Sequence, residues 1–309
     1  MDVSIIIVNF NAFKILRNCI DSIINHTNNE IEFEIIVVDN NSTEGNIEIE
    51  LNGYTCVQLI RNQYNKGFAA ANNQGIRIAK GRYILFLNND TVFIEDSLSK
   101  ILDFSIASNQ NLVGCKLLNS DMTIQPSIND KDTLSNSFGE NFFIYKIFPQ
   151  IRSLNRWYLS QHIPQNLTQV DLIKGAFMFC EKNIIEELKG FDERFFFYAE
   201  ETDLCLRAIS KGYQIIYYPD TAIIHLGGYT TEKNLWFKYK NQSSARIQLF
   251  QKHYSGKQFY ILTAFHYVGI FLRVLIYFIA GLFSFNTNLF VKSFLYFKQL
   301  FIYPKNLFK

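Results

Sequence analysis

The chain has 309 residues, of which 48% are hydrophobic, and this suits one large or two small globular domains. Residues 1–230 hold 19 Lys/Arg and 27 Asp/Glu, whereas residues 231–309 hold 11 Lys/Arg and one acid. A basic segment rich in aromatic and aliphatic residues favours an anionic membrane surface over nucleic acid, and no nucleic-acid-binding motif accompanies it. The five cysteines are scattered without a CxxC pair, which is typical of reduced thiols in a cytosolic protein.

Buried strands alternate with helices in the first third of the chain. Short apolar runs at 4–10, 33–42, 56–62 and 82–90 are typical of parallel strands, and 12–25 and 68–80 have helical spacing. This alternation predicts an α/β domain with a mostly parallel central sheet. Ligands of such sheets bind at the carboxyl ends of the strands, where Asp39 and Asp90 are expected.

The middle of the chain is less regular. Residues 116–170 predict only loops and short elements, whereas 170–191 predicts a strand and a helix that stops at Gly190. Residues 201–211 predict a helix closed by Gly212. Residues 213–228 predict two strands joined by a turn at Pro219–Asp220, with His225 at the end of the second.

Three polar stretches have both a structural and a functional interpretation. "VVDNNS" (37–42) and "LNND" (87–90) are either turn-forming clusters or strand-end binding residues. "NKGFAAANNQGI" (65–76) is either a plain loop into a helix or a backbone cradle for phosphate, with Gly67 and Gly75 permitting close approach. It lacks the GxGxxG and Walker signatures, which disfavours a Rossmann or P-loop site.

Acids crowd together in "FFFYAEETDLCLR" (195–207). Glu200, Glu201 and Asp203 follow four aromatic residues, where mutual repulsion and apolar neighbours make ionisation costly. A neighbouring carboxylate and an aromatic wall both raise the pKa of a carboxyl group toward the range of a general base.

Seven stretches in order give the chain a family resemblance. They are "SIIIVNFN", "IIVVDNNS", "NKGFAAANNQGI", "YILFLNNDT", "KGAFMF", "GFDERFFFYAEETDLCLR" and "PDTAIIHLGG", between residues 3 and about 230. Together they resemble the inverting family 2 glycosyltransferases of the GT-A type, within them the rhamnosyltransferase-like branch. The resemblance implies a GT-A nucleotide-diphospho-sugar transferase fold in residues 1–230. The basic charge and the aromatic and apolar content of residues 231–309 separately predict a helical, membrane-associating extension.

The resemblance also implies a donor site with a divalent metal, Mg²⁺ or Mn²⁺. Asp90 takes the place of the last acid of the family's DxD-type motif, here reduced to "NND", and His225 would complete the metal site. With one carboxylate, the metal would need oxygens from diphosphate and water. A structural His is the alternative for His225. The implied donor-binding residues are Asp39, Asn41, Asn65, Gly67, Asn73, Asn89 and Asp90.

The implied general base is Glu201, which matches the second acid of the family's acid-acid-x-acid segment. It would accept the proton of the attacking sugar hydroxyl. Glu200 would assist acceptor binding or tune the base, and Asp203 would fix the start of the helix. The family has Glu-Asp where this chain has Glu-Glu, so Glu200 stays open as the acting base.

The segment 259–285 is long and apolar enough to span a bilayer. A narrow polar line at helical spacing favours a helix lying in the membrane interface, with a true span or a soluble packing helix as alternatives. That line contains Thr263, His266, Arg273, Tyr277 and Ser284.

The resemblance therefore implies a metal-dependent inverting glycosyltransferase that transfers a hexosyl or deoxyhexosyl group from a nucleotide-diphosphate donor, dTDP-rhamnose or a UDP-sugar. The acceptor would be a hydroxyl of a growing, lipid-linked surface glycan, at the inner face of the cell membrane. The alternatives are a catalytically inactive glycan-binding scaffold subunit and a nucleotide-sugar-forming nucleotidyltransferase. The second needs a Gly-rich basic signature near the N-terminus that "SIIIVNFNAFK" lacks.

Overall fold

The computed structural model describes residues 1–108, 111–227 and 234–302. The chain forms two compact units. Unit 1 comprises Met1–Asn129, His162–Phe196 and Glu200–Thr230, and unit 2 comprises Asp130–Gln161, Phe197–Ala199 and Thr231–Lys309. The predicted domain boundary at residue 230 and the tail residues 303–309 lie outside the described residues. Unit 2 also contains the segment Asp130–Gln161, which was expected in the first domain.

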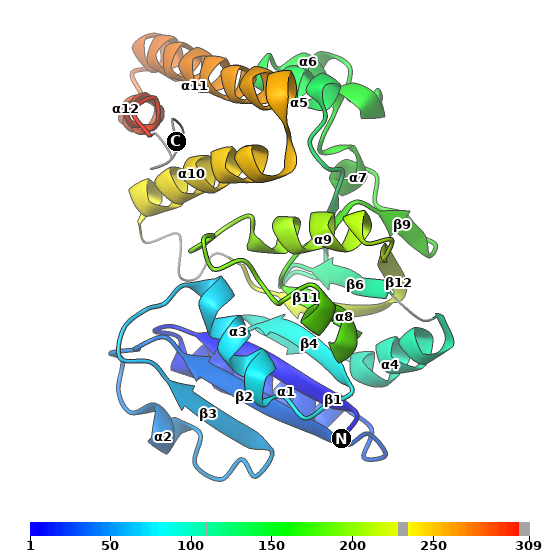
Figure 1. Cartoon of the computed structure of the whole chain (residues 1–309). Coiled ribbons are helices and arrows are strands. Elements are labelled where there is room, and N and C mark those ends of the chain that lie inside the picture. Colours follow the sequence, from blue (N-terminus) through cyan, green and yellow to red (C-terminus); the bar gives the residue numbers. More distant parts are fainter. Residues whose placement is uncertain (109–110, 228–233, 303–309) are drawn as a thin grey trace. The chain divides into compact units, whose positions relative to one another are not determined.

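Unit 1 is built on a mixed sheet with the strand order β3-β2-β1-β4-β11-β6-β12-β5 (Figure 1). The first four strands are parallel, β11 runs antiparallel to β4 and β6, and β12 is parallel to β6 but antiparallel to β5. The strands on this path are β1 (Val3–Asn9), β2 (Phe33–Asp39), β3 (Val57–Arg61), β4 (Tyr83–Asn88), β5 (Thr91–Phe93), β6 (Asn111–Leu118), β11 (Phe177–Glu181) and β12 (Gln214–His225).

Short strands extend this sheet and add a small second one. β7 (Ile124–Gln125) pairs with β6, and β9 (Thr168–Val170) pairs with β12. β8 (Ile128–Asn129) and β10 (Leu172–Ile173) pair with each other.

Helices cover both faces of the sheet because alternate strand residues point to opposite sides. On the face of Ile5, a core forms with Leu16 and Ile20 of α1 and Ile101 of α4. On the other face Ile6 packs so closely on α3 that a Cβ added at Gly75 would lie 2.6 Å from it. The helices of unit 1 are α1 (Phe13–His26), α2 (Ile47–Glu50), α3 (Phe68–Ile78), α4 (Ser97–Ser108), α8 (Lys182–Glu187) and α9 (Glu200–Ser210).

The prediction of two strands joined by a turn in residues 213–228 was wrong about the turn. Residues Gln214–His225 form a single strand, β12, whose register against β6 shifts between Tyr218 and Ala222. The Pro219–Asp220 step therefore sits at a bulge rather than at a turn, as expected for a proline that cannot donate to a ladder.

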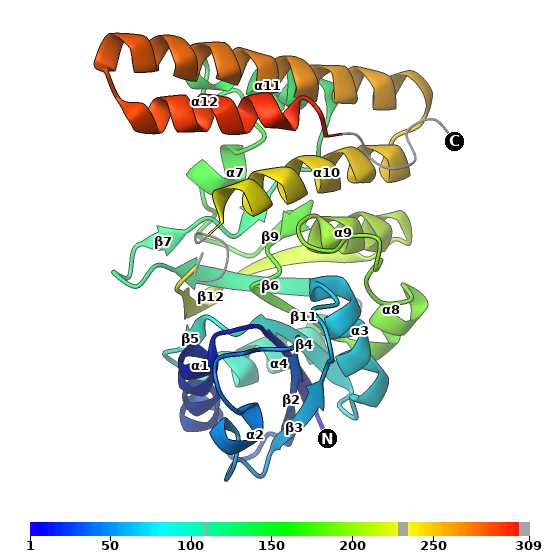
Figure 2. The ribbon, with the colours of Figure 1, turned by 90° about the vertical axis from the view of Figure 1, so that its left-hand side faces the viewer.

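Unit 2 is helical. Its helices are α5 (Leu134–Asn141), α6 (Ile144–Ile147), the 3₁₀ helix η1 (Arg152–Leu154), α7 (Tyr158–Gln161), α10 (Leu235–His253), α11 (Gly256–Ser284) and α12 (Thr287–Gln299). The first of them begins at a capping box between Thr133 and Asn136, inside the segment expected to hold loops and short elements. Figure 2 shows α11 and α12 side by side as a helical hairpin.

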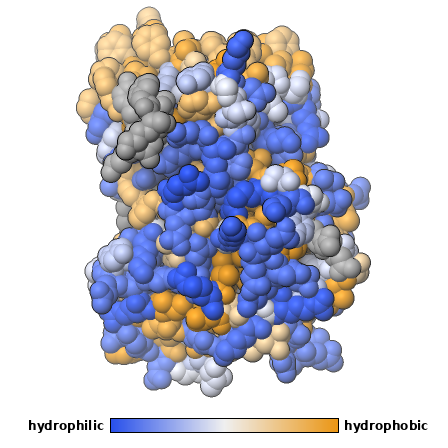
Figure 3. All heavy atoms as spheres, in the orientation of Figure 1, coloured by the Kyte–Doolittle hydropathy of each residue, from blue (hydrophilic) through white to orange (hydrophobic). Residues whose placement is uncertain are grey.

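The polar line of α11 is used inside unit 2. His266 is buried and its Nε2 lies 2.9 Å from Oγ of Ser243 in α10, while burial lowers its pKa to about 3. Glu140 of α5 is also buried, which alone would raise its pKa, but Arg246 outweighs this and lowers it to about 2. Figure 3 shows hydrophobic residues gathered over α11 at the top of the view. Thr263 and His266 are therefore buried on this helix, whereas Ser284 at its end is exposed and many large apolar side chains face outward.

Candidate active site

The polar ends of three parallel strands meet at one edge of the sheet in unit 1. Asn9 at the end of β1 is in register with Asp39 of β2, and Val8 is in register with Asn88 of β4. Asp90 follows directly and is largely buried, with 9% of its surface exposed. The predicted position of Asp39 and Asp90 at carboxyl strand ends is confirmed.

The Asp39 carboxylate organises the turn that follows β2. Its Oδ1 accepts hydrogen bonds from Asn9 Nδ2 at 2.9 Å and Ser42 Oγ at 2.5 Å, and its Oδ2 accepts from Ser42 N at 3.0 Å. Asn41 within this turn has a left-handed backbone with φ 66°, which Asn tolerates better than most residues. Asn9 also accepts a hydrogen bond through Oδ1 from Asn89 Nδ2 at 2.9 Å. A connected amide and carboxylate network thus lines the strand ends.

Two amides that were not among the predicted site residues shape the loop before α3. Asn40 donates from Nδ2 to the Gly67 carbonyl at 3.1 Å, and Asn62 donates from Nδ2 to Asn40 Oδ1 at 2.9 Å. Asn65 accepts from the Gly67 N–H at 2.9 Å. Gly67 has φ +84°, and a Cβ there would collide with the Phe196 carbonyl oxygen, so this position requires glycine. Asn65 and Gly67 therefore form a fixed entrance to α3.

Asn73 lies elsewhere on α3, with its side chain in use. Its Nδ2 donates to the Phe191 carbonyl at 2.8 Å and to Glu193 Oε1 at 2.9 Å, and its Oδ1 accepts from Phe191 N at 2.8 Å. The amide therefore fastens the loop after α8 to α3.

Asp90 and His225 face each other because β5 and β12 are paired. His225 is in register with Thr91, and its Nε2 lies 3.3 Å from Asp90 Oδ1. Both side chains are buried. Within residues 1–108, 111–227 and 234–302, no group of three or more His, Cys, Asp or Glu side chains is arranged to hold a metal. The protein thus offers one carboxylate oxygen and one imidazole nitrogen, which fits a cation whose other ligands come from diphosphate and water.

Glu200 and Glu201 begin α9 immediately after two left-handed residues, Tyr198 with φ 73° and Ala199 with φ 68°. Such conformations are costly outside glycine and cluster at functional sites. Burial, together with the charge of Glu201, raises the pKa of Glu200 well above its ordinary value. Burial also raises the pKa of Glu201, against the opposing effects of backbone N–H groups and Lys174. Among the described residues, Oε2 of neither glutamate has a hydrogen-bond partner.

The segment "KGAF" supplies a cation and a close contact to the same site. Burial lowers the pKa of Lys174, and the negative charges of Glu201 and Asp90 oppose this effect. A Cβ added at Gly175 would lie 3.4 Å from Cβ of Glu201, an ordinary van der Waals contact. Lys174 was not among the residues predicted for the site, although a lysine between two strand elements with acids nearby was the available signal.

Asp203 holds α9 in place. Its Oδ2 accepts from Nε of Arg207 at 2.8 Å, and this arginine donates through NH2 to the Gly190 carbonyl at 2.8 Å. The Asp203 carboxylate of this ion pair is fully buried. Asp203 thus anchors the helix that carries the two glutamates to the end of α8.

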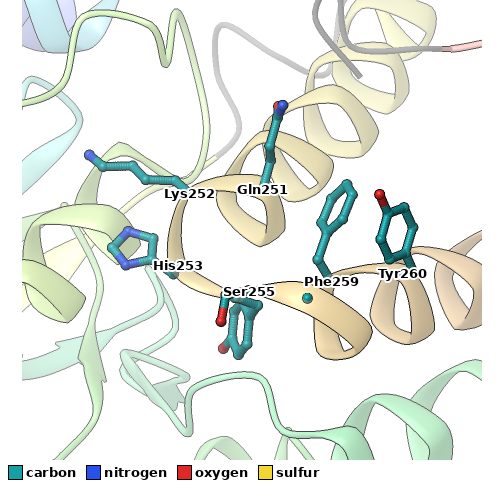
Figure 4. A pocket seen from close by; sticks show the side chains of 8 residues that line it. Gln251, Lys252, His253, Ser255, Phe259 and Tyr260 are labelled. Atoms are coloured by element: carbon teal, nitrogen blue, oxygen red, sulfur yellow. The ribbon is translucent and has the colours of Figure 1, made fainter. Parts of the chain in front are cut away.

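Two cavities in the described chain lie away from these residues. One of about 370 Å³ lies at the α10–α11 turn in unit 2, where Lys252, His253, Phe259 and Tyr260 contribute side chains (Figure 4). Another of about 430 Å³ lies in unit 1 beside α1, lined among others by Arg17, Asp21 and Glu50. Neither contains a residue of the strand-end network or of the glutamate pair.

These features define a GT-A type α/β protein: a mixed sheet, acids at the ends of its parallel strands, and buried glutamates on α9. Residues 4–163 match the family model described as "Glycosyl transferase family 2". The chain belongs to glycosyl transferase family 2.

Similar proteins include glycosyltransferases of several specificities. The chain is 34% identical over 122 residues to a poly(ribitol-phosphate) beta-glucosyltransferase of Bacillus spizizenii, covering 38% of this chain and 19% of that protein. It is 22% identical over 215 residues to an N-acetylglucosaminyl-diphospho-decaprenol L-rhamnosyltransferase of Mycobacterium tuberculosis, covering 65% and 68%. The chain spans 19%, 17% and 61% of the lengths of three curated relatives.

Solved structures confirm the fold. A mannosyltransferase of Pyrobaculum calidifontis in complex with GDP-Man and Mn²⁺ aligns with a TM-score of 0.58 at 12% identity, covering 96% of this chain and 85% of that one. Residues 1–349 of TarS from S. aureus align with a TM-score of 0.52 at 14% identity, covering 86% and 70%. At these identities the likeness establishes the fold alone.

Proposed function

We propose that the protein is an inverting glycosyltransferase that uses Glu201 as general base. The observation that carries this proposal is the buried glutamate pair, with raised pKa values and unpartnered oxygens, in the same unit as the Asp90–His225 pair. A carboxylate with a free oxygen at a strained helix start is suited to accept a proton from an incoming hydroxyl.

The reaction is a single displacement at the anomeric carbon. The acceptor hydroxyl oxygen forms the new C–O bond on one face of the sugar while its proton passes to a carboxylate oxygen of Glu201. The bond between the anomeric carbon and the diphosphate oxygen breaks on the other face, and both electrons leave with the nucleoside diphosphate. One displacement inverts the anomeric configuration. Glu200, held protonated by burial and its neighbour's charge, donates a hydrogen bond to the acceptor in this scheme.

Asp90 and His225 are the residues that would hold a divalent metal, Mg²⁺ or Mn²⁺. When bound, such a metal neutralises the charge that develops on the departing diphosphate. Support comes from the hard and borderline donor atoms of the pair and from their 3.3 Å separation. Lys174, which interacts with Asp90 and Glu201, adds a second positive charge on the diphosphate side.

The strand-end network is the proposed donor site. Asp39 and Asn41 would contact the base or ribose, Asn65 and Gly67 the nucleotide, and Asn89 the diphosphate side. We propose an indirect role for Asn73, since its amide is engaged by Phe191 and Glu193 and so holds the loop that precedes the catalytic helix.

The transferred group is proposed to be a hexose or deoxyhexose from a UDP-sugar or dTDP-rhamnose, and the acceptor a lipid-linked surface glycan. Support comes from the relatives' names, which include an L-rhamnosyltransferase that acts on a diphospho-decaprenol and a glucosyltransferase that acts on a diphosphoundecaprenol. The rhamnosyltransferase-like branch stays a prediction.

Peripheral association with the inner face of the cell membrane is proposed for unit 2. α11 is long and apolar enough to cross a membrane by length and composition only. Large apolar side chains cover its exposed side, whereas Thr263 and His266 are buried. An exposed apolar patch of this kind marks an interaction site. The exposed apolar residues of α11, of its C-cap and of α12 include Phe271, Leu275, Ile276, Phe278, Ile279, Leu282, Phe283, Phe285, Phe294 and Phe297. Lys292 and Lys298 of α12 add positive charge for anionic lipids.

The test is a transfer assay with purified protein, Mn²⁺, a panel of nucleotide-sugars and a lipid-linked acceptor. We expect release of nucleoside diphosphate from one donor of the panel, and the acceptor should accelerate this release. The anomeric proton signal of the product should show a configuration opposite to that of the donor. A product that keeps the anomeric configuration of the donor would contradict the single-displacement mechanism.

A further inference from the structure

A chain of side-chain hydrogen bonds runs through the β6–β7 hairpin of unit 1 to His225. Thr123 Oγ1 donates to Asp121 Oδ1 at 2.5 Å, and Asn119 Nδ2 donates to Thr123 Oγ1 at 2.9 Å. Gln125 Nε2 donates to Asn119 Oδ1 at 2.9 Å, and Gln125 Oε1 lies 2.5 Å from Nδ1 of His225. The chain therefore ends on the imidazole of the proposed metal site.

The direction of every bond in this chain is determined by chemistry. An ionised carboxylate only accepts, and the hydroxyl and backbone N–H of Thr123 keep the pKa of Asp121 low. The single hydroxyl proton of Thr123 is thereby used, so Thr123 must accept from Asn119. The Asn119 oxygen is then left to accept from Gln125, which assigns the two ends of the Gln125 amide.

Two further contacts fix the Gln125 amide in the same orientation. Its Nε2 lies 2.9 Å from the His225 carbonyl oxygen, which can only accept. Its Oε1 lies 3.1 Å from Nζ of Lys174, which as an ammonium can only donate. Three independent contacts, to Asn119, to the His225 carbonyl and to Lys174, therefore turn Oε1 toward His225.

Because Gln125 Oε1 can only accept a hydrogen bond, Nδ1 of His225 must be the donor. The neutral ring therefore carries its proton on Nδ1. Nε2 then presents a lone pair. Around Nε2 lie Asn88 Nδ2, a donor at 3.3 Å, and Asp90 Oδ1, an acceptor at 3.3 Å. A lone pair and a carboxylate oxygen that face each other with no proton between them repel, unless a cation lies near both.

We propose that Gln125 is a positioning residue that holds His225 in the Nδ1–H tautomer and so presents Nε2, together with Asp90, to a divalent cation. The inference rests on the proposed metal site and adds the residue that prepares it. It also links Lys174 to that site, because Lys174 and His225 donate to the same Gln125 oxygen. Partners of this kind, which bond the second nitrogen of a ligating histidine, typically change metal affinity 10–100-fold when removed.

The test reads the tautomer directly in metal-free protein by ¹⁵N-labelled imidazole NMR at a pH where the ring is neutral. The His225 signals are assigned by their loss in His225→Gln. Gln125→Met keeps the side-chain length but removes both polar ends, whereas Thr123→Ser in the same hairpin keeps the hydroxyl and serves as the matched control. Thermal unfolding without metal checks that each variant is folded.

Wild type and Thr123→Ser are expected to show a protonated Nδ1 and a bare Nε2. Gln125→Met is expected to shift toward the Nε2–H form, in which the ring donates to Asp90, and to bind Mn²⁺ about 10–100-fold more weakly in titrations. A wild-type Nε2–H tautomer, or an unchanged tautomer in Gln125→Met, overturns the inference. The expected tautomers with no Mn²⁺ broadening of the His225 signals would uphold the positioning role and remove the metal site from the proposed function.

Discussion

Nε2 of His225 lies 3.3 Å from Oδ1 of Asp90, although the two residues come from distant parts of the sequence. They meet because β12 returns antiparallel to β5, which places His225 opposite Thr91. The single carboxylate of the "NND" segment thus gains a nitrogen partner from a strand formed much later in the chain. In the proposed function, a divalent cation held by both would need the diphosphate to complete its shell, and metal binding would then be coupled to donor binding.

This coupling predicts the behaviour of Asp90→Asn. The amide keeps the shape but loses the negative charge, so donor affinity in the presence of Mn²⁺ should fall at least tenfold and metal should no longer improve it. Titration calorimetry of the nucleotide-sugar with Mn²⁺ and with EDTA measures both effects. Wild-type affinity together with an unchanged response to EDTA would place the metal elsewhere.

The second prediction concerns Glu201→Gln. An amide cannot accept the acceptor's proton, so transfer should fall by about 10²–10⁴ while donor affinity stays near wild type. Glu200→Gln is the matched control from the same helical turn and should retain much more activity, because an amide still donates a hydrogen bond. Steady-state rates for both variants decide the assignment, and the reverse ranking would make Glu200 the base.

The buried glutamates also predict how stability depends on pH. The pKa of Glu200 is raised in the folded protein, so the folded state holds a proton that the unfolded state releases. Stability from this group is complete below the ordinary glutamate pKa of about 4.3 and is lost as the pH rises through the raised value. Glu200→Gln should therefore unfold at a higher temperature than wild type at neutral pH.

The advantage of Glu200→Gln should vanish as the pH falls below the ordinary glutamate range. Melting curves at several pH values test this, with the exposed Glu30→Gln as the control that should show no such trend. A variant less stable than wild type at neutral pH would mean that the Glu200 charge is compensated in the folded protein.

Much of the site could be predicted from sequence because its residues stand at strand ends. Continuous apolar runs fix where β2 and β4 end, so the amino-acid pattern alone places Asp39 and Asp90 at the edge of the sheet. The amide partners could not be predicted in this way, because the roles of Asn40, Asn62 and Gln125 depend on contacts between segments far apart.

The individual short elements of the middle segment could not be assigned for a similar reason. The helix α5 is short, and its buried polar residues, such as Glu140, pair with Arg246 from α10 rather than forming an apolar stripe. The polar line of α11 was recognised, but the burial of His266 against α10 follows from tertiary packing that spacing alone does not specify.

The exposed apolar surface of α11 gives a prediction about lipid. Phe283 and Phe285 are 84% and 90% exposed, so Phe283→Asp with Phe285→Asp should leave unit 2 folded and weaken binding to anionic vesicles by about tenfold or more. Tyr64→Asp changes an aromatic residue of unit 1 that is 64% exposed and should have no effect. Vesicle sedimentation compares the three proteins, and equal binding by all would remove this surface from the membrane proposal.

The central claim is that this chain transfers a sugar by base catalysis from Glu201 with a donor bound at the strand ends. The most direct measurement is nucleoside diphosphate release from a panel of nucleotide-sugars with Mn²⁺, with and without a lipid-linked acceptor, by wild type and Glu201→Gln. We predict release from one donor that the acceptor accelerates in wild type and that Glu201→Gln loses while still binding that donor. A donor that binds to wild type yet is never cleaved, with or without acceptor, would contradict the claim.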